Sequence, residues 1–213
     1  MKLHTFQFLD QHKHGPAFAT FLKLRQQILV DSLGWSLPND GEYEMDQYDR
    51  VDAFYSIVTN DNGDAIAGAR AAPCNASWGG WSYMLNDAAK GLIPEIPSDL
   101  MEHYPQTADT WECTRFVSSQ PEDSYATKLV VAGICKIAIE HGAKELICLS
   151  PIRLLRLLRS YGYNVHKAGK TYLCDDDQRR YVPLRMHTSA ANLPEPITSA
   201  SPKPTENRFQ VNF

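Results

Sequence analysis

The sequence has 213 residues, of which 43% are hydrophobic, and this is enough for one domain with a buried core. The net charge of −4 and the spread of Lys and Arg along the chain exclude the basic surface of a nucleic-acid-binding protein. No apolar run has the length of a membrane span or the form of a secretory signal. The five cysteines are widely spaced in mostly apolar surroundings, which indicates reduced thiols. We therefore expect a cytoplasmic protein with neither nucleic acid nor membrane as a partner.

The first predicted element is an amphipathic helix over residues 17–33, where apolar side chains recur at helical spacing around Arg25. The loop that follows, GWSLPNDGEYEMDQYDR (residues 34–50), crowds carboxylates among Trp35 and two tyrosines. A charge beside a half-buried ring loses part of its hydration, and a solvated loop ordinarily avoids that cost. The mixture therefore predicts a pocket for a cation.

A β-hairpin is predicted next, because residues 53–59 and 65–72 are β-rich runs on either side of the turn sequence DNGD. Arg70 is expected at the end of the second strand. Residues 73–110 show little periodicity beyond a short helix near residues 84–92. The sequence TWECTRFVS, which follows, predicts another strand.

The next part of the chain predicts two helices separated by a strand. Residues 124–142 form a strongly apolar pattern that ends at a glycine, which favours a helix with a glycine C-cap. A buried strand is predicted over residues 144–150. Ser150 and Pro151 are then expected as the N-cap and the first turn of a helix over residues 152–162.

Short strands over residues 164–174 and 179–186 complete the predicted elements. Their order favours an α/β (α+β) sandwich, with a central mixed or antiparallel sheet flanked by helices. Pro, Ser, Thr and Asn dominate the C-terminal residues, so we expect a domain over residues 1–188 and a mobile tail over residues 189–213. We expect no metal site, because HKH near the N-terminus lacks Cys or His partners at ligand spacing and indicates a solvated loop.

Four sequence motifs stand out together: LRQQIL followed by GW, EMDQYD, GARAAP and ECTRF. In this order they resemble the pattern of the acyl-homoserine lactone synthases, the LuxI-type autoinducer synthases, over roughly residues 20–185. The matched positions are Arg25, Trp35, Glu44, Asp46, Asp49, Arg70, Glu112 and Arg115. Thr114 stands where the family commonly has Ser, and Ile28 and Leu29 stand where it usually has an aromatic residue.

The resemblance implies an acetyltransferase-like three-layer sandwich and a reaction between S-adenosylmethionine and an acyl thioester. S-adenosylmethionine would be a substrate, and no permanently bound cofactor is implied. The products would be the acyl-homoserine lactone, methylthioadenosine and the free carrier. The residues expected to act in catalysis are Glu112, Asp46, Arg70 and Glu44. The residues expected to bind S-adenosylmethionine are Arg25, Trp35, Asp46, Asp49, Thr114 and Arg115.

The chemistry of these residue types agrees with that expectation. Carboxylates would hold the sulfonium and the ammonium of the substrate, and the ring of Trp35 would attract the sulfonium or stack on adenine. The arginines would pair with the carboxylates or bind the methionyl carboxylate. Glu112 is our choice of general base, with Asp46 as the alternative. The competing interpretations are a structural ion network and, for Glu112, an ion pair with Arg115. In a regular strand these two side chains point to opposite faces, so a β-bulge is needed for them to share one.

The acyl donor is expected to be acyl carrier protein, with acyl-CoA as the alternative. Acyl-CoA N-acyltransferases of this superfold usually hold pyrophosphate at a Gly-rich turn, whereas VSSQPEDSYATK here lacks Gly and carries Glu122 and Asp123. Arginines at every third position of residues 152–162 would gather on one helix face, either as a solvated face or as a docking patch for the acidic carrier. These are Arg153, Arg156 and Arg159. The rival functions are an acyl-CoA N-acyltransferase and a non-enzymatic S-adenosylmethionine-binding regulator.

Overall fold

The computed structural model describes residues 1–121 and 124–188. The predicted mobile tail over residues 189–213, and with it the C-terminal limit of the predicted domain, lies outside the described residues. The same holds for Glu122 and Asp123. None of the helices formed by the described residues combines the length and the apolar character that crossing a bilayer requires.

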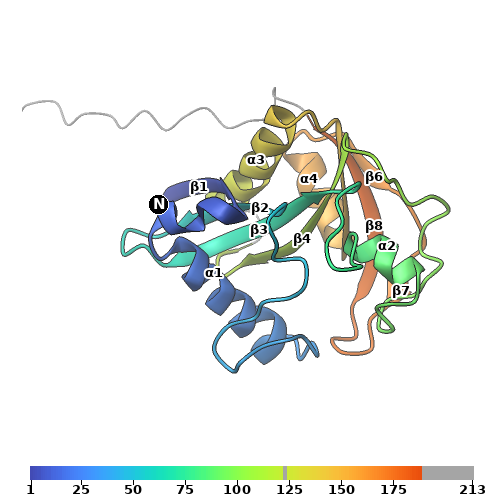
Figure 1. Ribbon diagram of the computed structural model, residues 1–213, viewed down its shortest axis with the longest axis horizontal. Helices are drawn as coiled ribbons and strands as arrows, with labels where there is room; N and C mark the ends of the chain where they lie inside the picture. Colours follow the sequence, from blue (N-terminus) through green and yellow to red (C-terminus); the bar gives the residue numbers. More distant parts are fainter. Residues whose placement is uncertain (122–123, 189–213) are drawn as a thin grey trace, which may run out of the picture.

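The described residues form an eight-stranded sheet whose strand order is β1-β2-β3-β4-β5-β8-β6, with β7 paired to β8 (Figure 1). Neighbouring strands run antiparallel except β4 and β5, which are parallel. The predicted mixed sheet and its hairpin are confirmed. The strands are β1 (Lys2–Gln7), β2 (Phe54–Thr59), β3 (Ala65–Pro73), β4 (Thr110–Ser118), β5 (Glu145–Pro151), β6 (Val165–Lys167), β7 (Tyr172–Leu173) and β8 (Arg180–His187).

Helices cover both faces of the sheet, as the predicted sandwich requires (Figure 1). Helices α3 and α4 share one apolar core with the sheet, and α1 packs on the opposite face. The predicted first helix continues past α1 as a π-helical segment, a form found frequently at functional sites. The helices are η1 (Phe8–His14), α1 (Ala17–Arg25), η2 (Gln26–Ser32), α2 (Met84–Ala89), α3 (Tyr125–Glu140) and α4 (Ile152–Ser160).

Strand β3 directs its side chains alternately to the two helical layers. Ala67, Ala69 and other small residues pack in the core beneath α3. Gly68 faces α1, where a Cβ atom would lie 2.6 Å from the Phe21 ring, so glycine is what allows this close approach. Arg70 follows two positions later and therefore points to the α1 side as well.

Strand β4 contains the bulge that the sequence required. Arg115 has a φ of 54°, and the pairing of β4 with β3 shifts register at this point. The described pairing of β4 with β5 runs from Thr110–Glu145 to Glu112–Ile147. Beyond that point the two parallel strands separate, and this separation opens the interior of the sandwich.

Two details of the sequence prediction are wrong. Arg70 lies inside β3, which continues to Pro73. Ser150 pairs with Val182 in β5, as the predicted strand over residues 144–150 requires, but it is not the N-cap of α4; that position is Pro151, which makes no side-chain cap. The strand extends this far because β8 supplies hydrogen-bond partners along the whole of β5, and this pairing outweighs the local preference of Ser for a cap.

Candidate active site

The acidic loop folds back against the first helix through its own side chains. The backbone N–H of Glu44 donates to the Leu22 carbonyl at 3.2 Å, which ties the loop to α1. Asp49 accepts the Asp46 N–H at 3.0 Å, and Asp46 in turn accepts the Tyr48 N–H at 2.8 Å. Asp side chains favour such local turns, so the EMDQYD spacing arranges its carboxylates in one tight bend.

Arg25 ends α1 inside this bend, with its side chain fully buried. Its two terminal nitrogens lie 2.8 Å from the two carboxylate oxygens of Asp49, a bidentate pair, and its Nε donates to Glu44. Tyr55 of β2 donates its hydroxyl to Asp49 at 2.8 Å. Both carboxylates are therefore satisfied without solvent.

Two further arginines enter from β3 and β4. Arg70 donates to Asp46 at 2.6 and 3.1 Å, lies 2.8 Å from Asp49, and donates its Nε to the Thr114 hydroxyl at 3.1 Å. Arg115 lies 2.6 Å from Asp46 and 3.1 Å from Glu44. We call this group the ion network: Arg25, Glu44, Asp46, Asp49, Arg70 and Arg115.

The ion network balances three positive charges against three negative ones in a buried position. Burial by itself raises the pKa of Asp49, but the guanidinium groups of Arg70 and Arg25 outweigh that effect and hold its pKa far below the ordinary value. The pKa of Asp46 is likewise lowered, by Arg70 and Arg115 against the effect of burial. The prediction that the arginines pair with the carboxylates is confirmed.

A cavity of about 680 Å³ lies where β4 and β5 separate. Its polar lining includes Trp35, Asp46, Thr114 and Arg115, which the motifs singled out. The other members of the ion network lie behind Asp46 and are absent from the described lining. Much of the apolar lining comes from α3, α4, β5 and β8, with Val131, Ile134, Leu154, Leu157, Leu184 and Met186 among its residues. The rest comes from η2, the loop after it and the segment after α2, with Leu29, Leu37 and Ile93 among its residues.

Glu112 occupies a separate position at the start of α2. Its carboxylate oxygens accept the backbone N–H groups of Met84 at 2.7 Å and Leu85 at 2.9 Å, and 4% of the residue is exposed. Burial raises the pKa of Glu112 to about 7, although the two N–H donors act in the opposite direction. The ion pair with Arg115 that we considered is absent among the described contacts, because Arg115 pairs with the ion network.

The profile of the autoinducer synthase family matches residues 11–192. The acyl-homoserine-lactone synthase of Ralstonia solanacearum is 33% identical over 161 residues, which cover 71% of this chain and 73% of that protein. The chain belongs to the autoinducer synthase family. The family that the motifs indicated is therefore confirmed, and with it the enzyme class, an acyltransferase.

Solved structures agree with this assignment. TofI, in a ternary complex with an inhibitor and MTA, superposes with a TM-score of 0.72 at 26% identity, over 91% of this chain and 96% of TofI. An acyl-CoA N-acyltransferase from Pseudomonas aeruginosa has a TM-score of 0.53 at 14% identity, over 88% of this chain and 99% of that chain. The second likeness concerns the fold alone, and it confirms the acetyltransferase-like sandwich.

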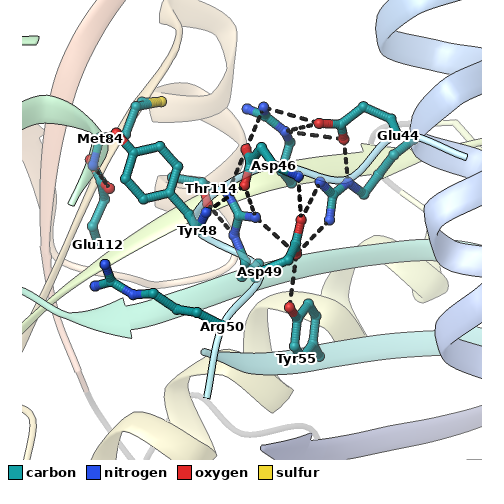
Figure 2. Close-up of polar contacts among 12 residues, drawn as sticks. Glu44, Asp46, Tyr48, Asp49, Arg50, Tyr55, Met84, Glu112 and Thr114 are labelled. Carbon is teal, nitrogen blue, oxygen red and sulfur yellow. Dashed lines mark hydrogen bonds and ion pairs between the residues drawn. The ribbon is translucent and has the colours of Figure 1, made fainter. Parts of the chain in front are cut away.

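Tyr48 lies between the ion network and the buried Asp87 in this autoinducer synthase. The sequence motifs assigned it no role. Its ring lies under the guanidinium of Arg70 at 5.6 Å and lines the cavity. Its hydroxyl donates to the buried Asp87 at 3.0 Å, and in Figure 2 the ring is drawn between Met84 and Asp46. The position of Tyr48 inside the EMDQYD bend was the available signal, but nothing in the sequence pairs it with Asp87.

Trp35 lines the cavity of the synthase as a half-buried ring. Its indole N–H donates to Asp177 at 3.1 Å, and its ring meets Tyr181 edge to face at 5.9 Å. Ile28 and Leu29, which stand where the family usually has an aromatic residue, lie in the π-helical segment and line the cavity with aliphatic side chains. Asp177 had no motif signal.

The arginines of α4 lie on its outer face. Arg153, Arg156 and Arg159 are exposed, whereas Leu155 and Leu158 of the same helix are buried. Arg153 is also a lining residue of the cavity, so the arginine face of this synthase reaches the cavity wall.

Proposed function

We propose that this chain makes an acyl-homoserine lactone, a quorum-sensing signal, from S-adenosylmethionine and an acyl thioester. The observation that carries the proposal is a single cavity with the charged edge of the ion network on one side and a long aliphatic wall on the other. A charged amino-acid nucleoside and an apolar acyl chain need those two surfaces side by side. The complex of TofI with an inhibitor and MTA supports the nucleoside half of this proposal.

In this proposal S-adenosylmethionine binds against Trp35, Asp46 and Arg115. Asp46 and Arg115 are the two members of the ion network that line the cavity, where the cationic groups and the methionyl carboxylate of the substrate would meet them in competition with their existing ion pairs. Glu44 and Asp49 then act indirectly, because neither belongs to the described lining of the cavity and both pair with arginines. Arg25 and Arg70 hold Asp46 and its bend in place, and Thr114 anchors the Nε of Arg70.

Glu112 is the proposed general base. A base whose pKa is about 7 is half deprotonated at neutral pH and accepts the proton of the substrate ammonium effectively. The freed amine attacks the thioester carbonyl, the new C–N bond forms, and the C–S bond breaks to release the carrier thiol. The methionyl carboxylate then attacks the methionyl Cγ, which is attached to the sulfonium. The new C–O bond closes the lactone, and the Cγ–S bond breaks to release methylthioadenosine. Asp46 remains the alternative base.

For the acyl donor we propose acyl carrier protein. The exposed arginines of α4 form a positive face on the helix that also walls the cavity, and Arg153 takes part in both. An acidic carrier would be steered to this face and could deliver its acyl chain past Arg153. The free state of each cysteine among the described residues fits an enzyme that works with such a carrier in the cytoplasm.

The experiment is to incubate the purified protein with S-adenosylmethionine and with acyl carrier protein or CoA loaded with the same acyl chain. Mass spectrometry should detect an acyl-homoserine lactone and an equal amount of methylthioadenosine, faster with the carrier protein. Lactone made faster from acyl-CoA would reject the donor proposal alone. Acylation of another amine would favour an ordinary N-acyltransferase, and binding without any product would favour a regulator.

A further inference from the structure

Asp177 lies in the turn between β7 and β8, far in sequence from every motif. Its Oδ2 accepts two hydrogen bonds, from the Trp35 indole N–H at 3.1 Å and from the Tyr181 hydroxyl at 2.6 Å. Its Oδ1 accepts the backbone N–H of Arg179 at 3.0 Å. The contact with Trp35 spans 142 residues of sequence and connects the loop after η2 to the C-terminal part of the sheet.

Both segments that this hydrogen bond connects contribute residues to the lining of the cavity. Trp35 lines it from the N-terminal loop, and Cys174, Arg179 and Tyr181 line it from the turn and from β8. Because Trp35 also meets Tyr181 edge to face, its ring is restrained at the N–H and at one edge. Its remaining surface is available to a ligand in the cavity.

We propose that Asp177 is a positioning residue that fixes the indole ring of Trp35 for S-adenosylmethionine. The inference rests on the function proposed above and assigns a residue outside the family motifs to it. A half-buried ring on a loop would otherwise exchange rotamers. Fixing the ring in one rotamer on ligand binding would cost conformational entropy and so weaken affinity. A ring held before binding avoids that loss, which is the general basis of a preorganised site.

A purely structural role for Asp177 makes a different prediction. The bonds to Arg179 and Tyr181 hold the turn together within its own segment, and their loss would disturb the whole wall of the cavity. Affinity for both substrates and the turnover number would then change together. A positioning role acts through Trp35, so it should alter the KM for S-adenosylmethionine selectively.

The chain offers a matched control in the same turn. Asp175 is exposed and stands two positions before Asp177, so Asp175→Ala removes the same charge from the turn without touching Trp35. Trp35→Phe keeps an aromatic face but lacks the N–H that donates to Asp177. Asp177→Asn keeps one acceptor oxygen and serves as a second variant in case Asp177→Ala does not fold.

Initial rates should be measured with each substrate varied, alongside thermal unfolding of every variant. We expect Asp177→Ala to raise the KM for S-adenosylmethionine about tenfold, the lower end of the scale for one hydrogen bond to a charged group. The kcat and the KM for the acyl donor should stay within about twofold, and Asp175→Ala should match the wild type. Asp177→Asn should raise the same KM by a smaller factor. In the Trp35→Phe background, Asp177→Ala should have no further effect.

An unchanged KM in Asp177→Ala, or an equal effect with and without the indole N–H, would overturn the inference. So would a fall in kcat and in donor affinity that parallels the loss of S-adenosylmethionine affinity. A wild-type protein that forms neither lactone nor methylthioadenosine would instead reject the proposed function, and the inference would fall with it. The wild-type assay therefore separates the two failures.

Discussion

Arginine serves two different purposes in this protein, one in the ion network and one on α4. Arg25 and Arg70 are buried, and every carboxylate near them is held in a fixed geometry. Arg153 and Arg156 lie on an exposed helix face whose shape depends on the leucines beneath. Removing one member of a set of buried, paired charges costs folding stability, because its partners stay buried without compensation. An exposed charge can be replaced at little cost. The difference separates the part of the molecule that builds the site from the part proposed to recognise a partner.

The largest expected effect is on folding. Arg70→Met should lower the free energy of unfolding by about 3–5 kcal/mol, because it leaves Asp46 and Asp49 buried with one guanidinium fewer. The matched change Arg156→Met on α4 should cost less than about 0.5 kcal/mol, since the residue is exposed. Chemical denaturation of both variants measures the contrast. Equal losses would show that burial in the ion network has no special energetic weight.

The second prediction concerns Glu112, which is buried like the ion network but paired with backbone groups. Glu112→Gln should reduce acylation by a factor of roughly 100 to 10,000, because an amide cannot accept the proton of the amine. The amide nitrogen would face a backbone N–H of α2, so a loss of about 1–3 kcal/mol in stability is expected as well. Titration with S-adenosylmethionine should show nearly wild-type affinity. Wild-type rates in the variant would transfer the role of base to Asp46.

The pH dependence tests the same residue. Only the deprotonated carboxylate accepts a proton, so kcat/KM should rise with pH and level off above a pKa of about 7, and Glu112→Gln should lack this rise. The free energy of unfolding should instead fall as the pH rises. A pKa raised in the folded state contributes stability that is complete below the ordinary pKa of Glu and is lost as the pH rises through about 7. A rate profile without that inflection would argue against Glu112.

The third prediction concerns the half-buried Trp35, whose exposure is intermediate between that of the ion network and that of the arginines on α4. Trp35→Ala should weaken binding of S-adenosylmethionine by up to about 30-fold, the scale of a desolvated cation–π contact. Its effect on the melting temperature should be smaller than that of Arg70→Met, because Trp35 is half-buried at the edge of the core around α1. Calorimetric titration and thermal unfolding measure the two quantities. Unchanged affinity together with a large fall in melting temperature would make Trp35 a core residue.

The smallest effect is expected at the exposed arginines. Changing Arg153, Arg156 and Arg159 together to Glu should raise the KM for acyl carrier protein about tenfold at low salt, since each exposed charge pair is worth about 0.2–1 kcal/mol. The KM for S-adenosylmethionine should stay nearly constant, and the effect should shrink as salt increases. Kinetics at two salt concentrations with each substrate varied provide the measurement. Equal behaviour of variant and wild type toward the carrier would reject the docking face.

The sequence predicted local structure and chemistry well and long-range contacts poorly. The DNGD hairpin and the apolar α3 follow from periodicity and turn residues, which act over a few positions. The pairing of EMDQYD with the arginines was predictable because charges of both signs recur in one motif set. The N-cap role predicted for Ser150 was wrong because pairing with β8, about 30 positions further along the chain, keeps this residue in β5. The contacts of Tyr48 with Asp87 and of Trp35 with Asp177 depend on tertiary packing and have no local signal.

The short pairing between β4 and β5 has a consequence for how such an enzyme changes during evolution. The parallel ladder joins the two strands from Thr110–Glu145 to Glu112–Ile147 and then stops. The ion network belongs to the segments before this seam and to β4, while β5, β8 and α4 on the other side supply part of the aliphatic lining of the cavity. Substitutions in residues 144–188 can therefore reshape the space for the acyl chain without disturbing a single charge of the network. Exchange of that segment between relatives should alter the proposed acyl preference in part, because residues within 28–134 also line the cavity.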